Sequence, residues 1–111
     1  MAFDAELANR IRALLGDRAT DEKKVFGGLA FMIGGNMAVA ASSNGGIIVR
    51  IDPAEGPELA ATTPAELMVM RSKAMTGWLR VDAEDVADDD ALAPWVELAA
   101  TYASSLPRKS R

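Results

Sequence analysis

The chain has 111 residues, with 12 Lys and Arg, 16 Asp and Glu, and neither Cys nor His. Its length fits one domain, and 50% hydrophobic with 25% charged residues is the composition of a folded globular protein. The lack of Cys and His excludes disulfides, thiolate nucleophiles, Ser-His-Asp triads and metal sites built on these residues. The net charge of −4 argues against non-specific nucleic-acid binding, which depends on neutralising phosphates.

The chain begins with one helix and a polar connection. Apolar residues recur at helical spacing from Phe3 to Leu15, which predicts an amphipathic helix over residues 4–15. Gly16 is a suitable residue to end it. Residues 16–24 are rich in charge and predict a loop.

Residues 25–33 predict a strand that contains Gly27 and Gly28. A glycine inside a strand usually marks a bulge or the close approach of another backbone. A phosphate-binding loop is the alternative, but neither a helix start nor the lysine of a P-loop follows the pair. We therefore interpret the two glycines as structural.

Two turns rich in Gly and Asn follow, at residues 34–36 and 44–46. They separate strands predicted at residues 37–42 and 47–51, so that three strands form an antiparallel meander. Side chains alternate between the two faces of a strand. Ile48 and Arg50 are therefore expected on the face opposite Ile47, Val49 and Ile51.

The second half of the chain predicts a helix, two strands and a final helix. Asp52 is a good N-cap for a short helix over residues 53–61. Residues 67–71 and 77–81 predict strands, joined by a connection at residues 72–76.

An acidic segment at residues 82–90 precedes the final helix, whose apolar stripe runs from Leu92 to Leu106. Asp90 is the expected N-cap, and Pro107 follows the end of the helix. Asp88, Asp89 and Asp90 are candidates for a divalent metal site, but three contiguous carboxylates diverge, so capping of the helix is the preferred role. Residues 107–111 are expected to form a flexible basic tail.

The predicted order is α-β-β-β-α-β-β-α. Strands grouped between single helices are typical of an α+β, two-layer fold with a mainly antiparallel sheet. No repeat or internal linker divides the chain, so residues 1–111 are expected to form one domain.

A signature near the start of the predicted sheet resembles a known family. The sequence KVFGGLAF at residues 24–31 is similar to the KMFGGL-x-F signature of the TfoX N-terminal domain family, also called TfoX/Sxy. Further segments follow in the family's order over nearly the whole chain: Asn36-Met37-Ala38, Val49-Arg50-Ile51, Ala74-Met75-Thr76-Gly77-Trp78, and Trp95 through Pro107. Two positions depart from the pattern, because Val25 replaces the usual Met and Ser72-Lys73-Ala74-Met75 replaces Gly-Arg-Pro-Met.

The resemblance implies a secretion-chaperone-like fold, α-β(3)-α-β(2)-α, which agrees with the order predicted from the residues. It assigns Phe26, Gly27, Gly28 and Gly77 to structural motifs. The competence regulators of the family carry a second, C-terminal domain, and the present chain is expected to be a standalone member without it.

A local basic patch is the candidate binding site. It consists of Arg50, Arg71, Lys73 and Arg80, to which Trp78 adds an aromatic face. Alternation predicts that Arg50 and Arg80 share one face of the sheet with Ile48 and Trp78. Arginine offers paired donors to phosphate or carboxylate, and Trp offers a stacking surface. The alternative is that these cations pair with the acidic segment or remain solvated.

The sheet face opposite the helices is expected to carry Ala38, Ala40, Ile48 and Trp78 besides Arg50 and Arg80. This set is too apolar for a face open to water. We therefore expect another chain or a rearranged terminus to cover it, most simply a second copy in a homodimer.

Together these patterns predict a non-enzymatic protein-interaction or regulatory module of the TfoX N-terminal type. It is expected in the cytoplasm, with no cofactor, metal, catalytic residue or membrane segment, and with Met and Trp side chains as anchors for a protein partner. Two alternatives stay open. One is a nucleic-acid, nucleotide or anion binder that uses the basic patch, and the other is a small enzyme that acts through paired carboxylates.

Overall fold

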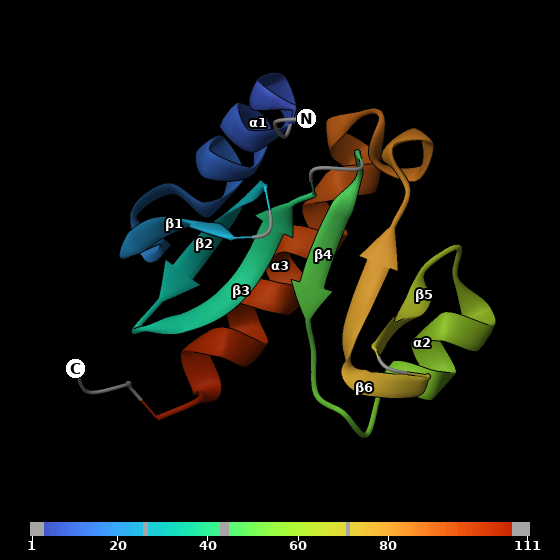
Figure 1. The fold of residues 1–111 in the computed structure, drawn as a ribbon. Helices are drawn as coiled ribbons and strands as arrows, with labels where there is room; N and C mark the ends of the chain where they lie inside the picture. The colour runs from blue at the N-terminus through green and yellow to red at the C-terminus, as the bar shows by residue number, and fades with distance from the viewer. Residues whose placement is uncertain (1–3, 26, 43–44, 71, 108–111) are drawn as a thin grey trace.

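Two helices cover one face of a six-stranded antiparallel sheet in the computed structural model, which describes residues 4–25, 27–42, 45–70 and 72–107 (Figure 1). The sheet has the order β1-β2-β3-β4-β6-β5. Helix α3 packs against β3 and β4, and α1 packs against α3. None of the described helices has the length and apolar character needed to cross a membrane.

The elements follow the chain in the predicted α+β order, with one additional strand. The helices are α1 (Ala5–Leu15), α2 (Gly56–Thr62) and α3 (Asp89–Ser105), and the short 3₁₀ helices are η1 (Gly16–Arg18) and η2 (Ala83–Val86). The strands are β1 (Asp21–Val25), β2 (Gly28–Ile33), β3 (Asn36–Ala41), β4 (Ile47–Arg50), β5 (Glu66–Met70) and β6 (Lys73–Val81). The two-layer, mainly antiparallel fold class is therefore confirmed.

Strand β1 lies in the segment that we expected to be a polar loop, and the single strand predicted at residues 25–33 is wrong. Val25 pairs with Gly28, so the chain turns between them, and Gly27 has a positive φ of 80°. Gly27 is thus a turn residue, and Gly28 begins β2 in a buried position. β1 consists mainly of exposed charged residues because it is an edge strand, and such a strand does not show the apolar alternation by which strands are predicted.

The core lies between the sheet and helices α1 and α3. Ile11 of α1, Phe31 of β2 and Leu92 of α3 are all fully buried in it. Ala38 belongs to this core, so its expected place on the opposite sheet face is wrong. The register between β2 and β3 shifts between Phe31 and Met32, and this bulge breaks the alternation on which the expectation rested.

The N-cap of helix α3 lies two residues earlier than predicted. Asp88, not Asp90, is the N-cap, and its Oδ1 accepts a hydrogen bond from the backbone N–H of Ala91 at 2.9 Å. Pro94 lies inside the helix. Helix α2 begins three residues later than predicted, because Asp52 caps a turn instead, with its Oδ1 accepting from the N–H of Ala54 at 2.9 Å.

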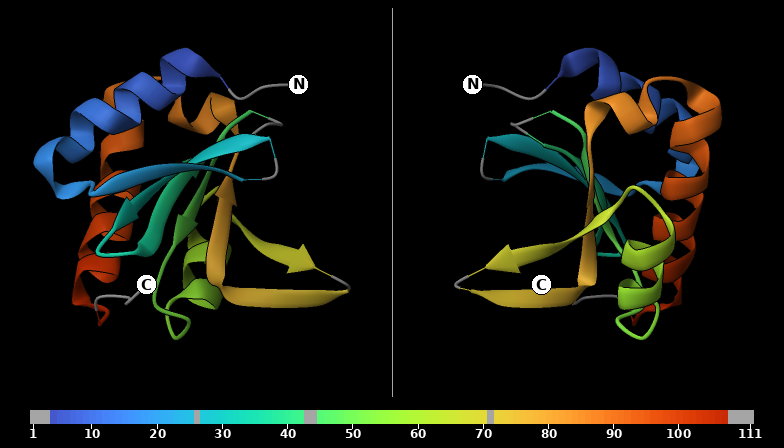
Figure 2. Two further views of the ribbon diagram at one scale, coloured as in Figure 1. Left: turned by 60° about the vertical axis from the view of Figure 1, so that its left-hand side comes forward. Right: turned by 90° about the vertical axis from the view of Figure 1, so that its right-hand side faces the viewer.

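The hairpin of β5 and β6 bends away from the rest of the sheet (Figure 2). Its register shifts between Leu67 and Met68, which pair with Leu79 and Met75. β6 therefore has three residues in its bend, Thr76, Gly77 and Trp78, opposite no residue of β5. The outer part, residues 68–70 and 72–75, projects as an arm on the side of the sheet that lacks helices. The predicted connection at residues 72–76 is wrong, because β6 already begins at Lys73.

Ion pairs fasten the first helical segment to the sheet and to α3. Arg12 holds Glu22 of β1 through two hydrogen bonds, and Arg18 of η1 holds Glu97 of α3 in the same bidentate way. The hydrogen bond from each arginine is the main reason that the pKa values of Glu22 and Glu97 lie below their usual value of 4.5.

Glu97→Gln is expected to reduce the dependence of stability on pH in acid. A lowered pKa in the folded state means that Glu97 stabilises the fold above its unfolded-state value of about 4.5, and that this contribution is lost as the pH falls through the lower folded-state value. Because the pair is exposed, the contribution is small, about 0.2–1 kcal/mol. Urea unfolding at pH 7 and pH 3 measures it. If the unfolding free energy changed by the same amount between pH 7 and pH 3 in the variant and in the wild type, the pair would contribute nothing to stability.

Candidate functional site

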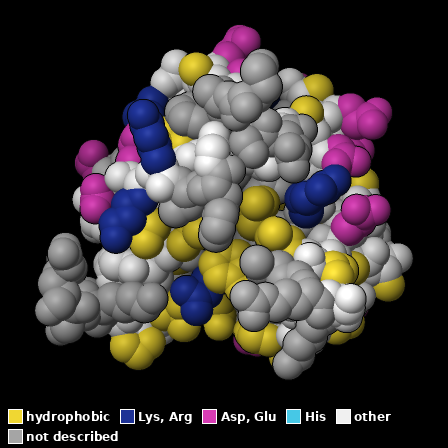
Figure 3. Space-filling model, in the orientation of Figure 1, with side chains coloured by type: hydrophobic (Ala, Val, Ile, Leu, Met, Phe, Trp, Pro, Cys, Tyr) yellow, Lys and Arg dark blue, Asp and Glu magenta, His cyan; other side chains and the backbone are white. Residues whose placement is uncertain are grey.

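The open face of the sheet, on the side away from α1 and α3, is the candidate site. One residue from each of the six strands lies in register across this face, in the order Lys23, Ala30, Ala40, Ile48, Arg80 and Glu66. Figure 3 looks onto this face, where hydrophobic side chains gather below the grey residues, with one Lys or Arg side chain among them and others to either side. The face is therefore mainly apolar, with cations within it and beside it.

Arg50 and Trp78 form the distinctive pair of this face. They are direct cross-strand partners on β4 and β6, and the Arg50 guanidinium carbon lies 5.3 Å from the centre of the Trp78 ring. Ile48 and Arg80 are the neighbouring cross-strand pair on the same two strands. The predicted sharing of one face by Arg50, Trp78, Arg80 and Ile48 is confirmed, because regular alternation holds along both strands here.

Arg50 differs from the arginines of the helical layer in its charge partners. Arg10, Arg12 and Arg18 each pair with a carboxylate at 2.6–2.8 Å. Within the described part of the chain, Arg50 has no carboxylate at salt-bridge distance. Its guanidinium therefore keeps its hydrogen-bonding capacity while an aromatic ring orients it.

Arg80 is bound only loosely to the acidic segment. Its Nη2 lies 3.5 Å from Oδ1 of Asp82, and both side chains are about half exposed. Pairing with residues 82–90, the alternative expected from the sequence, thus holds for Arg80 and not for Arg50. Glu66 is the cross-strand neighbour of Arg80 on β5, so this side of the face carries both signs of charge.

The remaining predicted site residues are only partly described. Arg71 and Phe26 lie outside the described residues. Lys73 begins β6 opposite Met70, and only its backbone is described. Gly77 lies in the bend of β6, where its carbonyl accepts a hydrogen bond from the N–H of Ile51 at 2.9 Å.

Small and flexible side chains complete the open face. Ala30 and Ala40 are nearly fully buried there, although neither belongs to the core between the sheet and the helices. Met32 and Met37 form a cross-strand pair further along β2 and β3, and both are partly exposed. Methionine adapts its shape to different neighbours and is common on surfaces that bind other proteins.

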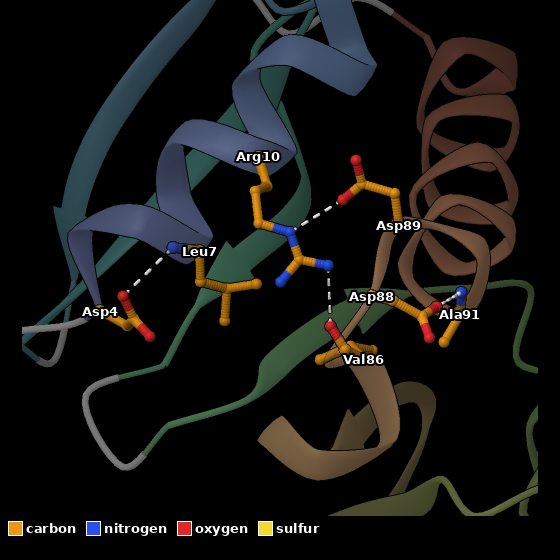
Figure 4. Close-up of polar contacts among 7 residues, drawn as sticks. All are labelled: Asp4, Leu7, Arg10, Val86, Asp88, Asp89 and Ala91. Carbon is orange, nitrogen blue, oxygen red and sulfur yellow. Dashed lines mark hydrogen bonds and ion pairs between the residues drawn. The ribbon is translucent and has the colours of Figure 1, made fainter.

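A cleft lies between α1 and the start of α3. This cleft, with a volume of about 380 Å³, is lined by Asp4, Glu6, Leu7, Arg10, Ala83, Val86, Ala87, Asp88 and Asp89. Figure 4 shows Arg10 spanning it, with Nε donating to Asp89 at 2.8 Å and Nη2 donating to the carbonyl of Val86 at 3.0 Å. Sequence reasoning missed this cleft because its two sides lie 76–79 residues apart.

The acids of this cleft already have structural roles. Asp4 caps α1 by accepting from the N–H groups of Glu6 and Leu7, Asp88 caps α3, and Asp89 pairs with Arg10. Capping of α3 by this group of three acids is therefore confirmed. The capping residue is Asp88 and not the predicted Asp90. We accordingly treat the cleft as a joint between α1 and α3, and the open face as the candidate site.

Comparison with known proteins gives one match. The family model described as "TfoX N-terminal domain" matches residues 14–103, which begin near the end of α1 and extend almost to the end of α3. No curated protein and no solved structure matches the chain.

Proposed function

The chain belongs to the TfoX N-terminal domain family, and we propose that it is a non-enzymatic regulatory module that binds a protein partner on its open face. The family supports a regulatory or competence-type role, and the open face supports the mode of action. The observation that carries the proposal is the Arg50–Trp78 pair, an arginine without a carboxylate among the described residues, held against an aromatic ring beside apolar positions.

This combination of residues is typical of interaction surfaces. Trp and Arg are the residues most enriched among those that contribute strongly to protein binding, and they act best near the centre of an interface. Trp78 provides a large apolar surface, and Arg50 provides paired donors for a carboxylate. The expected partner is therefore a protein that places an acidic side chain beside an apolar one.

The non-enzymatic part of the proposal rests on the chemistry of the residues. Without Cys and His, acid–base catalysis would require carboxylates, Lys or Tyr. The acids that line the cleft are used for capping and ion pairing. The open face contributes cations, an aromatic ring and apolar side chains, a set suited to binding.

A second candidate function is the binding of a nucleic acid or another phosphate anion. The same pair favours it, since a base can stack on Trp78 while Arg50 contacts a phosphate. Glu66 and Asp82 beside Arg80 disfavour it, because a polyanion would approach these carboxylates. We therefore place it second.

Trp78→Ala is expected to weaken binding of the protein partner at least 30-fold, the loss that corresponds to about 2 kcal/mol at a central interface residue. The partner is first isolated from a lysate of the source cells with the immobilised wild-type chain and identified by mass spectrometry. It is then titrated against wild type, Trp78→Ala, Arg50→Ala and the control Thr101→Ala, which changes an exposed position on α3. Equal affinities for wild type and Trp78→Ala would refute the open face as the binding site.

A parallel titration distinguishes the second candidate. Fluorescent single-stranded and duplex DNA oligonucleotides are added at two salt concentrations to wild type and Arg50→Ala. Micromolar binding that weakens with salt and is lost in Arg50→Ala would favour nucleic acid over protein. The absence of binding at low salt would remove this candidate.

A further inference from the structure

The two edges of the sheet differ sharply in their sequences. At one edge, β1 consists of Asp21, Glu22, Lys23, Lys24 and Val25, and all four charged residues are exposed. Charged side chains protect an edge strand, because its unpaired backbone groups would otherwise accept another strand. At the other edge, β5 has the sequence ELMVM, with Glu66 as its single charge. β5 therefore lacks the protection that β1 has.

The exposed part of this edge lies in the arm, at residues 68–70 of β5. Within the sheet, β5 pairs only with β6. Val69 is 64% exposed, and it is the large hydrophobic side chain in the described residues that stands most clearly in solvent. Figure 2 shows the arm projecting past the rest of the sheet, away from all three helices, so that no described element covers its outer edge. An apolar edge strand without Pro is a site at which a further strand adds.

We propose that the β5 edge pairs with the β5 edge of a second copy of this chain, in antiparallel orientation, and joins two six-stranded sheets into one. A strand can always pair with itself in this orientation about a two-fold axis, which yields a closed dimer. The charged β1 edges remain at the two outer ends of the joined sheet and stop further growth. The inference does not depend on the proposed partner of the open face.

The charges along the hairpin suit a second copy. Pairing that is centred on Val69 brings residue 66 of one copy opposite residue 72 of the other. The acidic Glu66 of one copy then comes opposite Ser72 of the other, which is followed in the sequence by the basic residue Lys73. The two-fold axis repeats this favourable arrangement at both ends of the strand pair. A partner strand without this alternation of charge would gain less from the same edge.

The open face is left free in this arrangement. We expected a homodimer to cover that face, whereas pairing through β5 uses backbone groups at the edge of the sheet. Arg50 and Trp78 belong to β4 and β6 and would remain accessible to a partner.

Sedimentation equilibrium at micromolar concentration tests the proposal. The wild-type chain is expected to sediment with twice its mass of 11.7 kDa, and Val69→Lys to sediment with the single mass. Val69 is exposed, so circular dichroism of the variant should match that of the wild type. Lys23→Asp, an equally exposed change at the β1 edge, is the matched control and should remain dimeric.

Cross-linking gives a second, independent measurement. Because the chain has no Cys, Val69→Cys introduces a single thiol, and a short bismaleimide should join two copies through it. Thr101→Cys on α3 should give no such product. A monomeric wild type, or a Val69→Lys variant that remains dimeric, would overturn the proposal. A dimer that dissociates in Trp78→Ala but not in Val69→Lys would likewise overturn it and assign the contact to the open face.

Discussion

Gly46→Ala is expected to destabilise the protein by about 2–5 kcal/mol. Gly46 has a φ of +77°, a conformation that costs a residue with a side chain about 1–2 kcal/mol. An added Cβ would also lie 2.2 Å from the carbonyl oxygen of Val81 and 3.0 Å from the N–H nitrogen of Ala83. Both contacts are with backbone, so relief requires β4 and the end of β6 to move apart, at a further cost of about 1–3 kcal/mol.

The neighbouring Gly45→Ala provides a control that separates the two contributions. Gly45 has a similar φ of +85°, but its added Cβ would meet only the Ala83 side chain, at an ordinary distance of 3.9 Å. This variant should lose about 1–2 kcal/mol, from the backbone conformation alone. Urea unfolding of both variants measures the difference. Equal losses at the two positions would mean that β4 and β6 are not held together at this point as closely as described.

Gly56→Ala is expected to destabilise the protein by about 2 kcal/mol, although helix propensity alone favours the change. Gly56 is the first residue of α2, and Ala is preferred to Gly in helices by about 1 kcal/mol. An added Cβ would lie 1.9 Å from the carbonyl oxygen of Thr76 and 3.2 Å from Cδ2 of Leu67. Thr76 is in the bend of β6, so overpacking of backbone against backbone outweighs the gain in propensity.

Ala61→Gly is the control for this prediction, because Ala61 is an exposed residue of the same helix. It should lose up to about 1 kcal/mol, as propensity predicts. Thermal or urea unfolding of both variants measures the two losses of stability. A Gly56→Ala variant more stable than the wild type would show that α2 does not press against the bend of β6.

The open-face pair could be predicted from the sequence because it depends on local alternation. Ile48 and Arg50 are two residues apart on β4, and Trp78 and Arg80 are two residues apart on β6, so each pair lies on one face of its strand. The sequence alone does not show how β4 and β6 are aligned, and this register makes Arg50 and Trp78 direct cross-strand partners. That register depends on contacts between distant parts of the chain.

Alternation failed as a guide wherever a strand has a bulge. The bulge opposite Phe31 and Met32 turns Ala38 into the core, and the shift between Leu67 and Met68 creates the bend from which the arm projects. A bulge changes the face of every residue beyond it, and no single residue type marks it. The arm and the exposed Val69 could therefore be found only in three dimensions.

Charged segments were the other source of error. β1 has the composition of a loop because an edge strand gains its stability from backbone pairing, and it keeps its charge to avoid pairing with other chains. The cleft at Arg10 was missed for a different reason. Its contacts form only when α1 packs against α3 and brings Arg10 to Val86 and Asp89. The sequence of neither helix shows that it packs against the other.

β6 is a single strand that serves two surfaces. Its inner half carries Trp78 on the open face, its outer half forms one side of the arm, and the bend at Gly77 lies between them. A change in the angle of that bend on assembly of two copies would change the geometry presented by Trp78. Thermodynamic reciprocity then requires that a ligand of the open face alter the dissociation constant of the dimer by the same factor by which dimerisation alters the affinity for that ligand. If two copies assemble as proposed, the oligomeric state and the occupancy of the open face would be coupled through the bend of β6.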